Sequence, residues 1–523
     1  MKKLRSFVTL LTALALCIPL CGALPVQASG DIVTYEVEGG KIQFNTLTRT
    51  VTHCDEHVTA ANIPASIEGV PVYAIGNNVF QYCRDLERVT IPEGVTSIGD
   101  FVFNCCSNLK EVNLPKSLKT VGYAAFSKCT SLEEITIPDG VTQMGQSVFE
   151  GCTALRKAKL SGGLTVISSS TFSGCQNLDE TAIPAGVTQI GMWAFNGCSS
   201  LKSINIPAGV DWISSGAFGG CISLTGITLP EGLTTIEDNL FAGCTGLTAI
   251  AIPSTVTRIS GGAFNGCTGL TTITIPAGVT GIGALAFYRC ENLTSVEMTG
   301  GVETIDYQAF YGCTKLQSIS IPATLYLIGN EVFQYCYELS DVYYAGTEQQ
   351  WGKVYNYDKS GFLTNAAIHY NSTMPPRIAY ASTQNVLVDG RSVEFQAYAL
   401  KDSNGYMTNY VKLRDVAYAL NGSSAQFQVG WDGSVNIVTG TAYTANGSEM
   451  HTPFAGNRAY TYPTAVTKVN GTLADLSAIV LQDDNGGGYT YFKLRDLGKA
   501  LGFNVDWSAE KGIFIETNKP YAG

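Results

Sequence analysis

Charged residues are scarce in this sequence, and histidine is nearly absent. Asp, Glu, Lys and Arg make up 14% of the 523 residues, and 4 residues are histidine. The formal net charge is -11, so the chain lacks the concentrated basic patch that nucleic acids and anionic membrane surfaces require. We therefore exclude a nucleic-acid partner, and we expect neither a cofactor nor a bound metal.

Long apolar runs are also missing, except at the start of the chain. There, Lys2, Lys3 and Arg5 precede an apolar run that ends at Leu20, and Ala28 offers a small residue for cleavage. This pattern predicts a secretory signal over residues 1–28. No later stretch approaches the ~20 apolar residues of a membrane-spanning helix. The sequence thus predicts a secreted, extracellular or cell-surface-associated protein without a membrane span.

Catalytic motifs are poorly represented. The sequence has no Gly-x-Ser-x-Gly elbow, no phosphate-binding loop and no defensible carboxylate pair. His53, Glu56 and His57 match the H-x-x-E-H spacing of a zinc hydrolase, which needs a helix to bring both histidines to one face. The β-branched residues around them favour a strand or loop instead. We predict a non-enzymatic protein, with a zinc hydrolase as an alternative.

A repeat of 23 residues dominates the middle of the chain. The pair Phe-x-x-Cys recurs twelve times without an insertion or deletion, which is typical of a solenoid built from identical turns. The pairs are Phe80/Cys83, Phe103/Cys106, Phe126/Cys129, Phe149/Cys152, Phe172/Cys175, Phe195/Cys198, Phe218/Cys221, Phe241/Cys244, Phe264/Cys267, Phe287/Cys290, Phe310/Cys313 and Phe333/Cys336.

Each repeat has the pattern of a short strand followed by a corner. Aliphatic residues usually stand six and eight positions after the cysteine, as in Ile204 with Ile206 and Ile273 with Ile275. This alternation predicts a β-strand with one face inward. Proline and glycine usually follow and predict a tight turn. One turn cannot bury its apolar side chains alone, so we expect neighbouring turns to bury them by stacking.

The recurring cysteines lie in register, so their side chains would point in parallel along the stack. A disulfide needs two Cβ atoms about 3.8 Å apart that face each other. We therefore predict a buried ladder of free thiols rather than disulfides, with the neighbours Cys105 and Cys106 as the first place to find an exception.

The pattern Leu-x-x-Ile-x-Ile-Pro-x-x-Val-x-x-Ile-Gly-x-x-Ala-Phe-x-x-Cys resembles the BspA-type (treponemal) leucine-rich repeats of bacterial surface proteins. The resemblance implies a leucine-rich-repeat solenoid over residues 63–345, with an N-terminal cap at 29–62 and a C-terminal cap and linker at 346–379. It also implies extracellular adhesion or binding to host surfaces.

A second duplication follows the repeats. Residues 410–420 align with residues 491–501, 81 positions later, and both segments contain Lys-Leu-Arg-Asp at the start of a helical apolar pattern. Hairpin signals at Asp389-Gly390 and Asn470-Gly471 precede the two helices, and strands ending at Trp431 and Trp507 follow them. The fold class predicted for the chain is therefore an α/β-type, β-rich solenoid with short turns, followed by two small α+β modules at 380–445 and 446–523.

These modules resemble the copper amine oxidase N-terminal-like, or stalk, domains that bacteria append to secreted proteins. The resemblance implies a spacer or a wall-facing module rather than copper chemistry. We expect the Lys-Leu-Arg-Asp segments to begin helices through local ion pairing.

Candidate binding residues point outward from the early repeats, four and five positions after each cysteine. Charged pairs there would suit an extracellular protein or glycan, although any solvated face carries polar residues. Exposed tryptophans in adjacent turns would stack on sugar rings. The candidates are Glu87, Arg88, Lys110, Glu111, Glu133, Glu134, Arg156, Lys157, Trp193 and Trp212. The sequence predicts a bacterial binding protein, with a purely structural wall or matrix component as the alternative.

Overall fold

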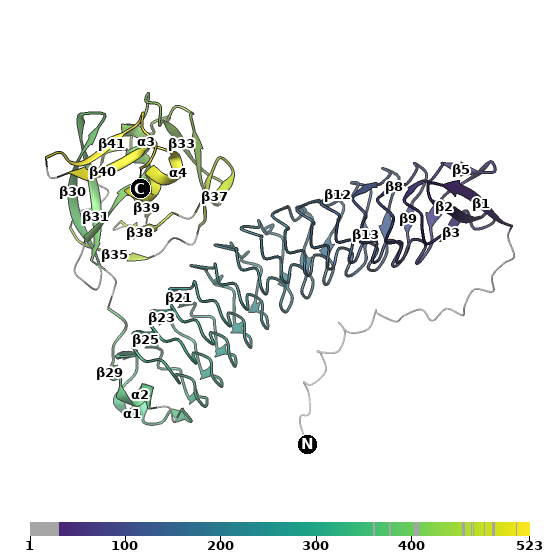
Figure 1. Ribbon diagram of the computed structural model, residues 1–523. Coiled ribbons are helices and arrows are strands. Elements are labelled where there is room, and N and C mark those ends of the chain that lie inside the picture. The colour runs from purple at the N-terminus through teal and green to yellow at the C-terminus, as the bar shows by residue number, and fades with distance from the viewer. Residues whose placement is uncertain are drawn as a thin grey trace, which may run out of the picture.

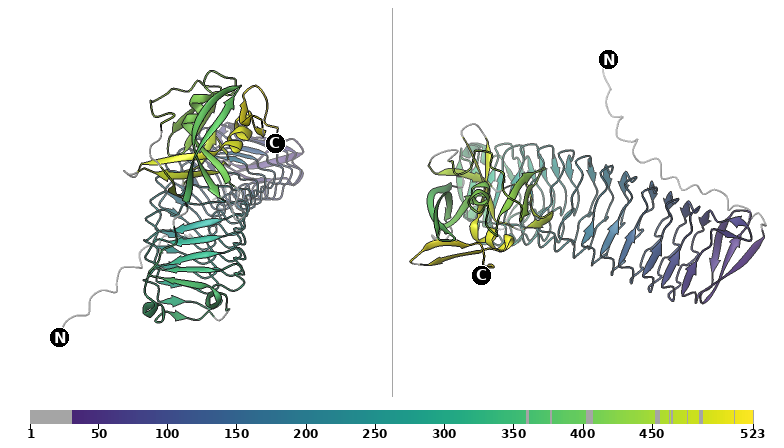
Figure 2. Two further views of the ribbon diagram at one scale, coloured as in Figure 1. Left: turned by 90° about the vertical axis from the view of Figure 1, so that its left-hand side faces the viewer. Right: turned by 90° about the horizontal axis from the view of Figure 1, so that it is seen from above.

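The protein consists of a long β-solenoid and a β-rich C-terminal unit that lies beside the C-terminal half of the solenoid (Figures 1 and 2). The computed structural model describes residues 31–358, 361–375, 378–401, 407–451, 456–461, 463, 465–474, 476–483, 487–508 and 510–522. The secretory signal predicted at residues 1–28 lies outside these residues.

Most turns of the solenoid contribute a strand, just after the cysteine, to a parallel ladder that we call the first ladder. Its strands are β4 (Ala60–Asn62), β8 (Arg88–Thr90), β10 (Glu111–Asn113), β12 (Glu134–Thr136), β14 (Lys157–Lys159), β16 (Glu180–Thr181), β21 (Thr272–Ile275), β23 (Ser295–Met298), β25 (Ser318–Ile321), β27 (Asp341–Tyr344) and β29 (Ala367–Tyr370). The alternation in the repeat predicts these strands, and residues such as Val89 and Ile273 point inward as expected.

The first ladder is interrupted twice. Strands β10 and β12 do not pair with each other, and the segments 203–206, 226–229 and 249–252 do not form strands. The strand expected at Ile204 and Ile206 is therefore wrong, although both side chains are buried. Gly226, which offers no side chain to pack, lies in this region and weakens pairing.

A second parallel ladder lies on another side of each turn, and the sequence pattern did not predict it. Its short strands are β7 (Ala74–Ile75), β9 (Ser97–Ile98), β11 (Thr120–Val121), β13 (Gln143–Met144), β15 (Val166–Ile167), β17 (Gln189–Ile190), β18 (Trp212–Ile213), β19 (Thr235–Ile236), β20 (Arg258–Ile259), β22 (Gly281–Ile282), β24 (Thr304–Ile305), β26 (Leu327–Ile328) and β28 (Tyr355–Asn356).

Phenylalanine and cysteine side chains form continuous columns inside the solenoid. All twelve repeat phenylalanines are buried, and neighbouring rings stack with centroids 5.1 to 5.9 Å apart. From Cys106 to Cys336, each repeat thiol donates a hydrogen bond of 2.9 to 3.2 Å to the phenylalanine carbonyl of the preceding turn. The predicted ladder of free thiols is confirmed.

No disulfide forms among the described cysteines. Cys105 and Cys106, the expected first exception, are both free thiols. Cys106 points into the core and donates to the carbonyl of Phe80. Cys105 has a left-handed backbone with φ of 63° and is half-buried. The two adjacent side chains therefore have different environments.

Both ends of the solenoid are closed by additional strands. At the N-terminal end, the antiparallel strands β1 (Ile32–Val37), β2 (Gly40–Asn45) and β3 (Thr50–Cys54) lead into the second ladder, because β3 pairs with β7. A small hairpin follows, made of β5 (Ser66–Ile67) and β6 (Val70–Pro71). At the other end, β28 and β29 extend the two ladders beside the short helices α1 (Glu348–Trp351) and α2 (Phe362–Asn365).

The C-terminal unit contains the two predicted helices and both predicted hairpins. Asp389-Gly390 and Asn470-Gly471 have positive φ at both positions, as a tight hairpin turn needs. The elements are β30 (Ile378–Val388), β31 (Arg391–Lys401), β32 (Met407–Lys412), α3 (Leu413–Ala419), β33 (Phe427–Trp431), β34 (Val435–Thr439), β35 (Arg458–Thr461), β36 (Thr467–Val469), β37 (Thr472–Ala474), β38 (Ala478–Gln482), β39 (Gly488–Lys493), α4 (Leu494–Leu501), β40 (Asn504–Ser508) and β41 (Gly512–Glu516).

The two copies of the C-terminal duplication exchange strands. Strand β32 of the first copy pairs with β39 of the second. Strand β30 pairs with β41, and β34 pairs with β36, so each copy also completes a sheet of the other. Side chains from both copies share one apolar core. We therefore expect the two modules to fold together.

Candidate functional site

The outward face of the first ladder carries a row of charges in its first five turns. The strand register places Glu111 beside Arg88, and Lys157 between Glu134 and Glu180. All five side chains are exposed because they alternate with buried residues along two-sided strands. Four of these residues, Arg88, Glu111, Glu134 and Lys157, are candidates expected from the sequence, and the row is interrupted between β10 and β12.

A second row, one position earlier in each turn, contains Glu87, Lys110, Glu133 and Arg156, all exposed. Lys110 forms an ion pair with Glu87 across adjacent turns, with Nζ and Oε2 3.4 Å apart. The structure therefore brings all eight predicted charged residues together on one face.

Ion pairs neutralise part of this face. Besides Lys110, Lys157 pairs with Glu180 at 2.6 Å, and Arg88 pairs with Glu38 of the N-terminal cap at 2.6 Å. The hydrogen bond to Glu180 and its charge raise the pKa of Lys157. Such exposed pairs contribute little to stability, because water and salt screen them. Their main effect is to fix a pattern of alternating charge.

The break between β10 and β12 opens a groove of about 650 Å³ on this face. The inward positions of β10 are less covered there than in other turns, since Val112 and Leu114 are only half-buried, whereas Val89 and Ile91 of the preceding turn are buried. The floor of the groove is therefore apolar. The second ladder continues past this point through β9, β11 and β13, so the turns separate on one side only.

Charged residues surround the apolar floor of the groove. The charged lining residues are Lys110, Glu111, Lys116, Glu134, Asp139 and Lys159. An apolar centre with a polar rim is typical of surfaces that bind proteins.

Three groove residues, Asn113, Thr136 and Lys159, were missed by the sequence reasoning. Each stands seven positions after its cysteine, whereas the candidates chosen from the sequence stand four and five positions after it. Period-two alternation puts both positions on the same face, so this signal was present in the sequence.

Trp193 and Trp212 do not lie with the charged residues. Trp212 is on β18 of the second ladder and is 53% exposed. Trp193 is 52% exposed and has a left-handed backbone with φ of 56°. Its indole lies over Gly216 of the next turn, where any Cβ would collide with the ring. The ten candidate residues therefore divide between different sides of the solenoid.

The histidine motif does not adopt the geometry of a zinc hydrolase. His53 is on strand β3 and pairs in register with Gln43, while His57 lies in the turn after this strand. His57 contacts Asp85, with Nδ1 and Oδ2 2.9 Å apart, and this contact raises its pKa. Within the residues that the structure describes, no group of three His, Cys, Asp or Glu side chains is arranged to hold a metal ion.

The C-terminal unit lies over a later part of the solenoid that carries fewer charges, with Glu231 and Glu297 among the residues that line the space between them. A cleft of about 700 Å³ separates the two, lined by Thr228, Ala249 and Ala251 from the solenoid and by Trp431 and Pro463 from the C-terminal unit. Figure 1 shows the C-terminal unit on the side of β21 and β23, with the turns around β8 and β12 left open. The charged groove is therefore accessible.

The fold and this open face define a β-solenoid repeat protein with an extended exposed surface. The model of the BspA-type leucine-rich repeat region matches in six copies, over residues 73–202, 165–276 and 234–360. The chain belongs to this family, whose members are typically surface proteins involved in binding. The resemblance seen in the repeat sequence is confirmed, whereas the resemblance of the C-terminal modules to stalk domains stays a prediction.

Solved structures of bacterial repeat proteins resemble the chain. A leucine-rich repeat protein from Bacteroides ovatus is 25% identical, with 65% of this chain and 98% of the other covered and a TM-score of 0.49. A leucine-rich cell surface protein from Faecalibacterium prausnitzii is 26% identical, with 63% and 99% covered and a TM-score of 0.38. The pneumococcal vaccine antigen PcpA is 17% identical, with 66% and 98% covered and a TM-score of 0.38.

No curated protein gives a significant match to the sequence. In the part of the chain that the structure describes, no helix combines the length and the apolar character that crossing a membrane requires.

Proposed function

We propose that this protein is secreted or held at a bacterial cell surface and binds an extracellular protein through the first ladder of its early turns. The groove between β10 and β12 carries the proposal, because it combines an apolar floor with an alternating charged rim. A partner would bury Val112 and Leu114 and meet both signs of charge. The C-terminal unit would act as a spacer or would face the wall of the producing cell.

The charge pattern suits a protein partner better than a glycan at this site. Arginine and lysine beside glutamate and aspartate favour a partner with complementary charges of both signs, which contribute to specificity and to the association rate. The predicted tryptophan candidates for sugar stacking lie on other sides of the solenoid and do not join this groove.

Surface plasmon resonance of the purified protein against immobilised host matrix proteins tests this function. We expect saturable binding that weakens with added salt, since exposed charges are screened. Lys159→Glu should weaken this binding about tenfold, because the reversed charge repels the partner group that the lysine attracts. Lys353→Glu makes the same charge change at an exposed position of the C-terminal cap, away from the groove, and should leave binding unchanged.

A purely structural wall or matrix component gives a different result in this experiment. It would show no saturable binding to any protein of the panel, or binding that Lys159→Glu and Lys353→Glu affect equally. Either outcome would contradict a specific site in the groove.

A further inference from the structure

The C-terminal unit contains two equivalent pockets, one for each copy of its duplication. The first has a volume of about 500 Å³ and is built around Arg414 and Trp431. The second has a volume of about 390 Å³ and is built around Arg495 and Trp507. The pocket residues come from matching positions of the two copies, so the same pocket occurs twice in one chain.

Each pocket combines elements of both copies. In the first pocket, the start of α3 and strand β33 meet strand β39 of the second copy. In the second pocket, the start of α4 and strand β40 meet strand β32 of the first copy. The antiparallel pairing of β32 with β39 relates the two pockets by a local two-fold axis. Strand exchange therefore creates both pockets together.

The tryptophans of the pockets are not core residues. Trp431 is 65% exposed and Trp507 is 60% exposed, although both stand at the ends of well-paired strands. A solvent-exposed tryptophan contributes little to folding, yet both copies have one at the same place beside an arginine. An exposed indole offers an apolar face with a negative quadrupole, which suits the C–H groups of a sugar ring.

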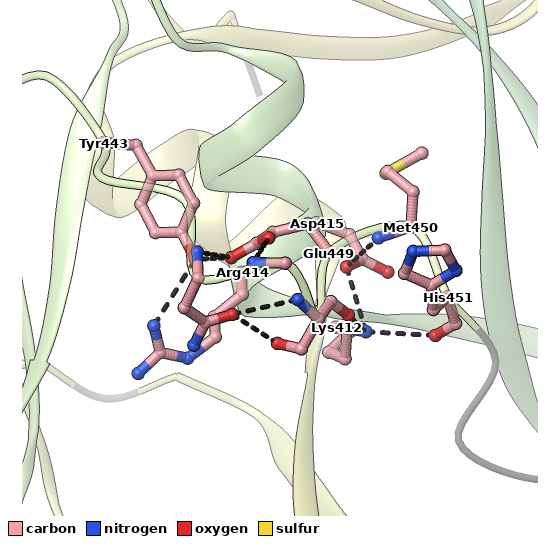
Figure 3. Close-up of polar contacts among 10 residues, drawn as sticks. Lys412, Arg414, Asp415, Tyr443, Glu449, Met450 and His451 are labelled. Carbon is pink, nitrogen blue, oxygen red and sulfur yellow. Dashed lines mark hydrogen bonds and ion pairs between the residues drawn. The ribbon is translucent and has the colours of Figure 1, made fainter.

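Positive charge lies beside each tryptophan. In the first pocket Lys412 is buried and is held by Asp415, with Nζ and Oδ1 3.1 Å apart, and by the carbonyls of Ser448 and His451 (Figure 3). Lys412 therefore stabilises the fold, and Arg414 is the cation that can bind a ligand in the pocket. The guanidinium of Arg414 donates a hydrogen bond to the hydroxyl of Tyr443, at 3.3 Å.

The second pocket has the same elements. Arg495 is exposed, and Lys493 lies 3.8 Å from Asp496, so this pair is looser than its counterpart. Asp506 lines the pocket as well and offsets part of its positive charge. Thr408 and Asn409 of β32 supply hydroxyl and amide groups that can bind sugar hydroxyls.

We propose that these twin pockets bind sugar units of an acidic polysaccharide, with the tryptophan stacked on a ring and the arginine paired with a carboxylate. Arginine matches the planar, two-oxygen geometry of a carboxylate. Two pockets on one rigid unit would engage two units of a polymer and raise its apparent affinity. This proposal specifies the wall-facing role of the C-terminal unit and does not depend on the groove of the solenoid.

Isothermal titration of the full chain with short oligogalacturonates tests the proposal, and neutral galacto-oligosaccharides of equal length serve as the control ligand. We expect two sites per chain for the acidic oligosaccharide and at least tenfold weaker binding of the neutral one. Trp507→Ala should remove one site, and Trp431→Ala with Trp507→Ala should remove both. Arg495→Gln should weaken binding of the acidic ligand about tenfold at the second pocket only, leave the first pocket unchanged, and leave binding of the neutral ligand unchanged.

The matched control variant is Tyr418→Ala, which removes an exposed aromatic side chain from α3 that does not line either pocket. It should leave binding unchanged. Equal binding of acidic and neutral oligosaccharides would overturn the assignment of an acidic ligand. Absence of binding, or binding that survives the double tryptophan variant, would overturn the proposal as a whole. Lys159→Glu should not affect this titration, so its outcome is separate from that of the solenoid experiment.

Discussion

The thiol of Cys198 donates a hydrogen bond to the carbonyl oxygen of Phe172, 3.2 Å away in the preceding turn. This oxygen also accepts a hydrogen bond from the backbone N–H of Cys175, at 3.0 Å. Both residues joined by the thiol contact are fully buried, so water cannot replace the thiol. The recurring cysteine thus fills the core and also satisfies the backbone of its neighbouring turn.

Cys198→Ala should lower the free energy of unfolding by about 1 to 2 kcal/mol, because it removes this donor and leaves a small cavity. Cys198→Ser keeps a donor and should cost less than alanine. Chemical denaturation followed by circular dichroism measures both. The control Asn177→Ala removes an exposed side chain of the adjacent loop and should change little. Equal losses for serine and alanine would contradict the role of the hydrogen bond.

Cys105 should react with a maleimide well before the repeat cysteines. It is half-buried, whereas the repeat thiols are almost inaccessible. Burial also raises the pKa of Cys244 and of Cys290 to about 12, which suppresses their reactive thiolates at neutral pH. Peptide mapping by mass spectrometry after a short pulse of reagent checks the order. Labelling of Cys244 as fast as Cys105 would be incompatible with a closed solenoid.

Gly197→Ala should destabilise the protein by about 1 kcal/mol, since its φ of 70° is left-handed and disfavours any Cβ. Space is not the problem, because the nearest atom to that Cβ would be 3.7 Å away. Gly209→Ala is the matched control: no atom lies within 4 Å of its Cβ and its φ is ordinary. Gly197→Ala should therefore unfold at a lower temperature than Gly209→Ala. The reverse order would contradict the left-handed turn at Gly197.

Glu449→Gln should destabilise the C-terminal unit at pH 7 by about 1 to 3 kcal/mol. Burial disfavours the charged carboxylate, but hydrogen bonds from the backbone N–H groups of Asn446 and Gly447 and from the Tyr443 hydroxyl outweigh it and lower its pKa to about 2. Because the pKa of Glu449 is lower in the folded protein than its ordinary value of 4.5, the carboxylate adds stability at pH values above 4.5. This stability is lost as the pH falls from 4.5 toward 2.

Urea denaturation of the wild type and of Glu449→Gln at several pH values measures this effect. The difference between the two proteins should shrink as the pH falls through this window. A difference that stays constant down to pH 2.5 would show that the charge of Glu449 does not matter.

The repeat made most of the solenoid predictable. The fixed spacing of phenylalanine and cysteine located the core columns, and alternation located the inward face of the first ladder. The second ladder escaped prediction because each of its strands is two residues long, as in Ser97–Ile98, and two residues cannot show a period.

The groove could not be predicted, because it depends on which neighbouring strands fail to pair. The turns of β10 and β12 have the same repeat pattern as turns that do pair. In the C-terminal unit, local sequence patterns predicted both helices and both hairpins. They could not predict that strands of one copy pair with strands of the other, because this pairing joins residues far apart in the sequence. The twin pockets appear only once β32 lies beside β39.

Hydrogen–deuterium exchange of the protein, alone and bound to a partner from the matrix-protein panel, shows which face of the solenoid the partner covers. We expect protection of residues 110–116 and 134–140, where the two sides of the groove lie, with no change in the second ladder of the same turns. Protection confined to the second ladder or to the C-terminal unit would contradict binding through the groove.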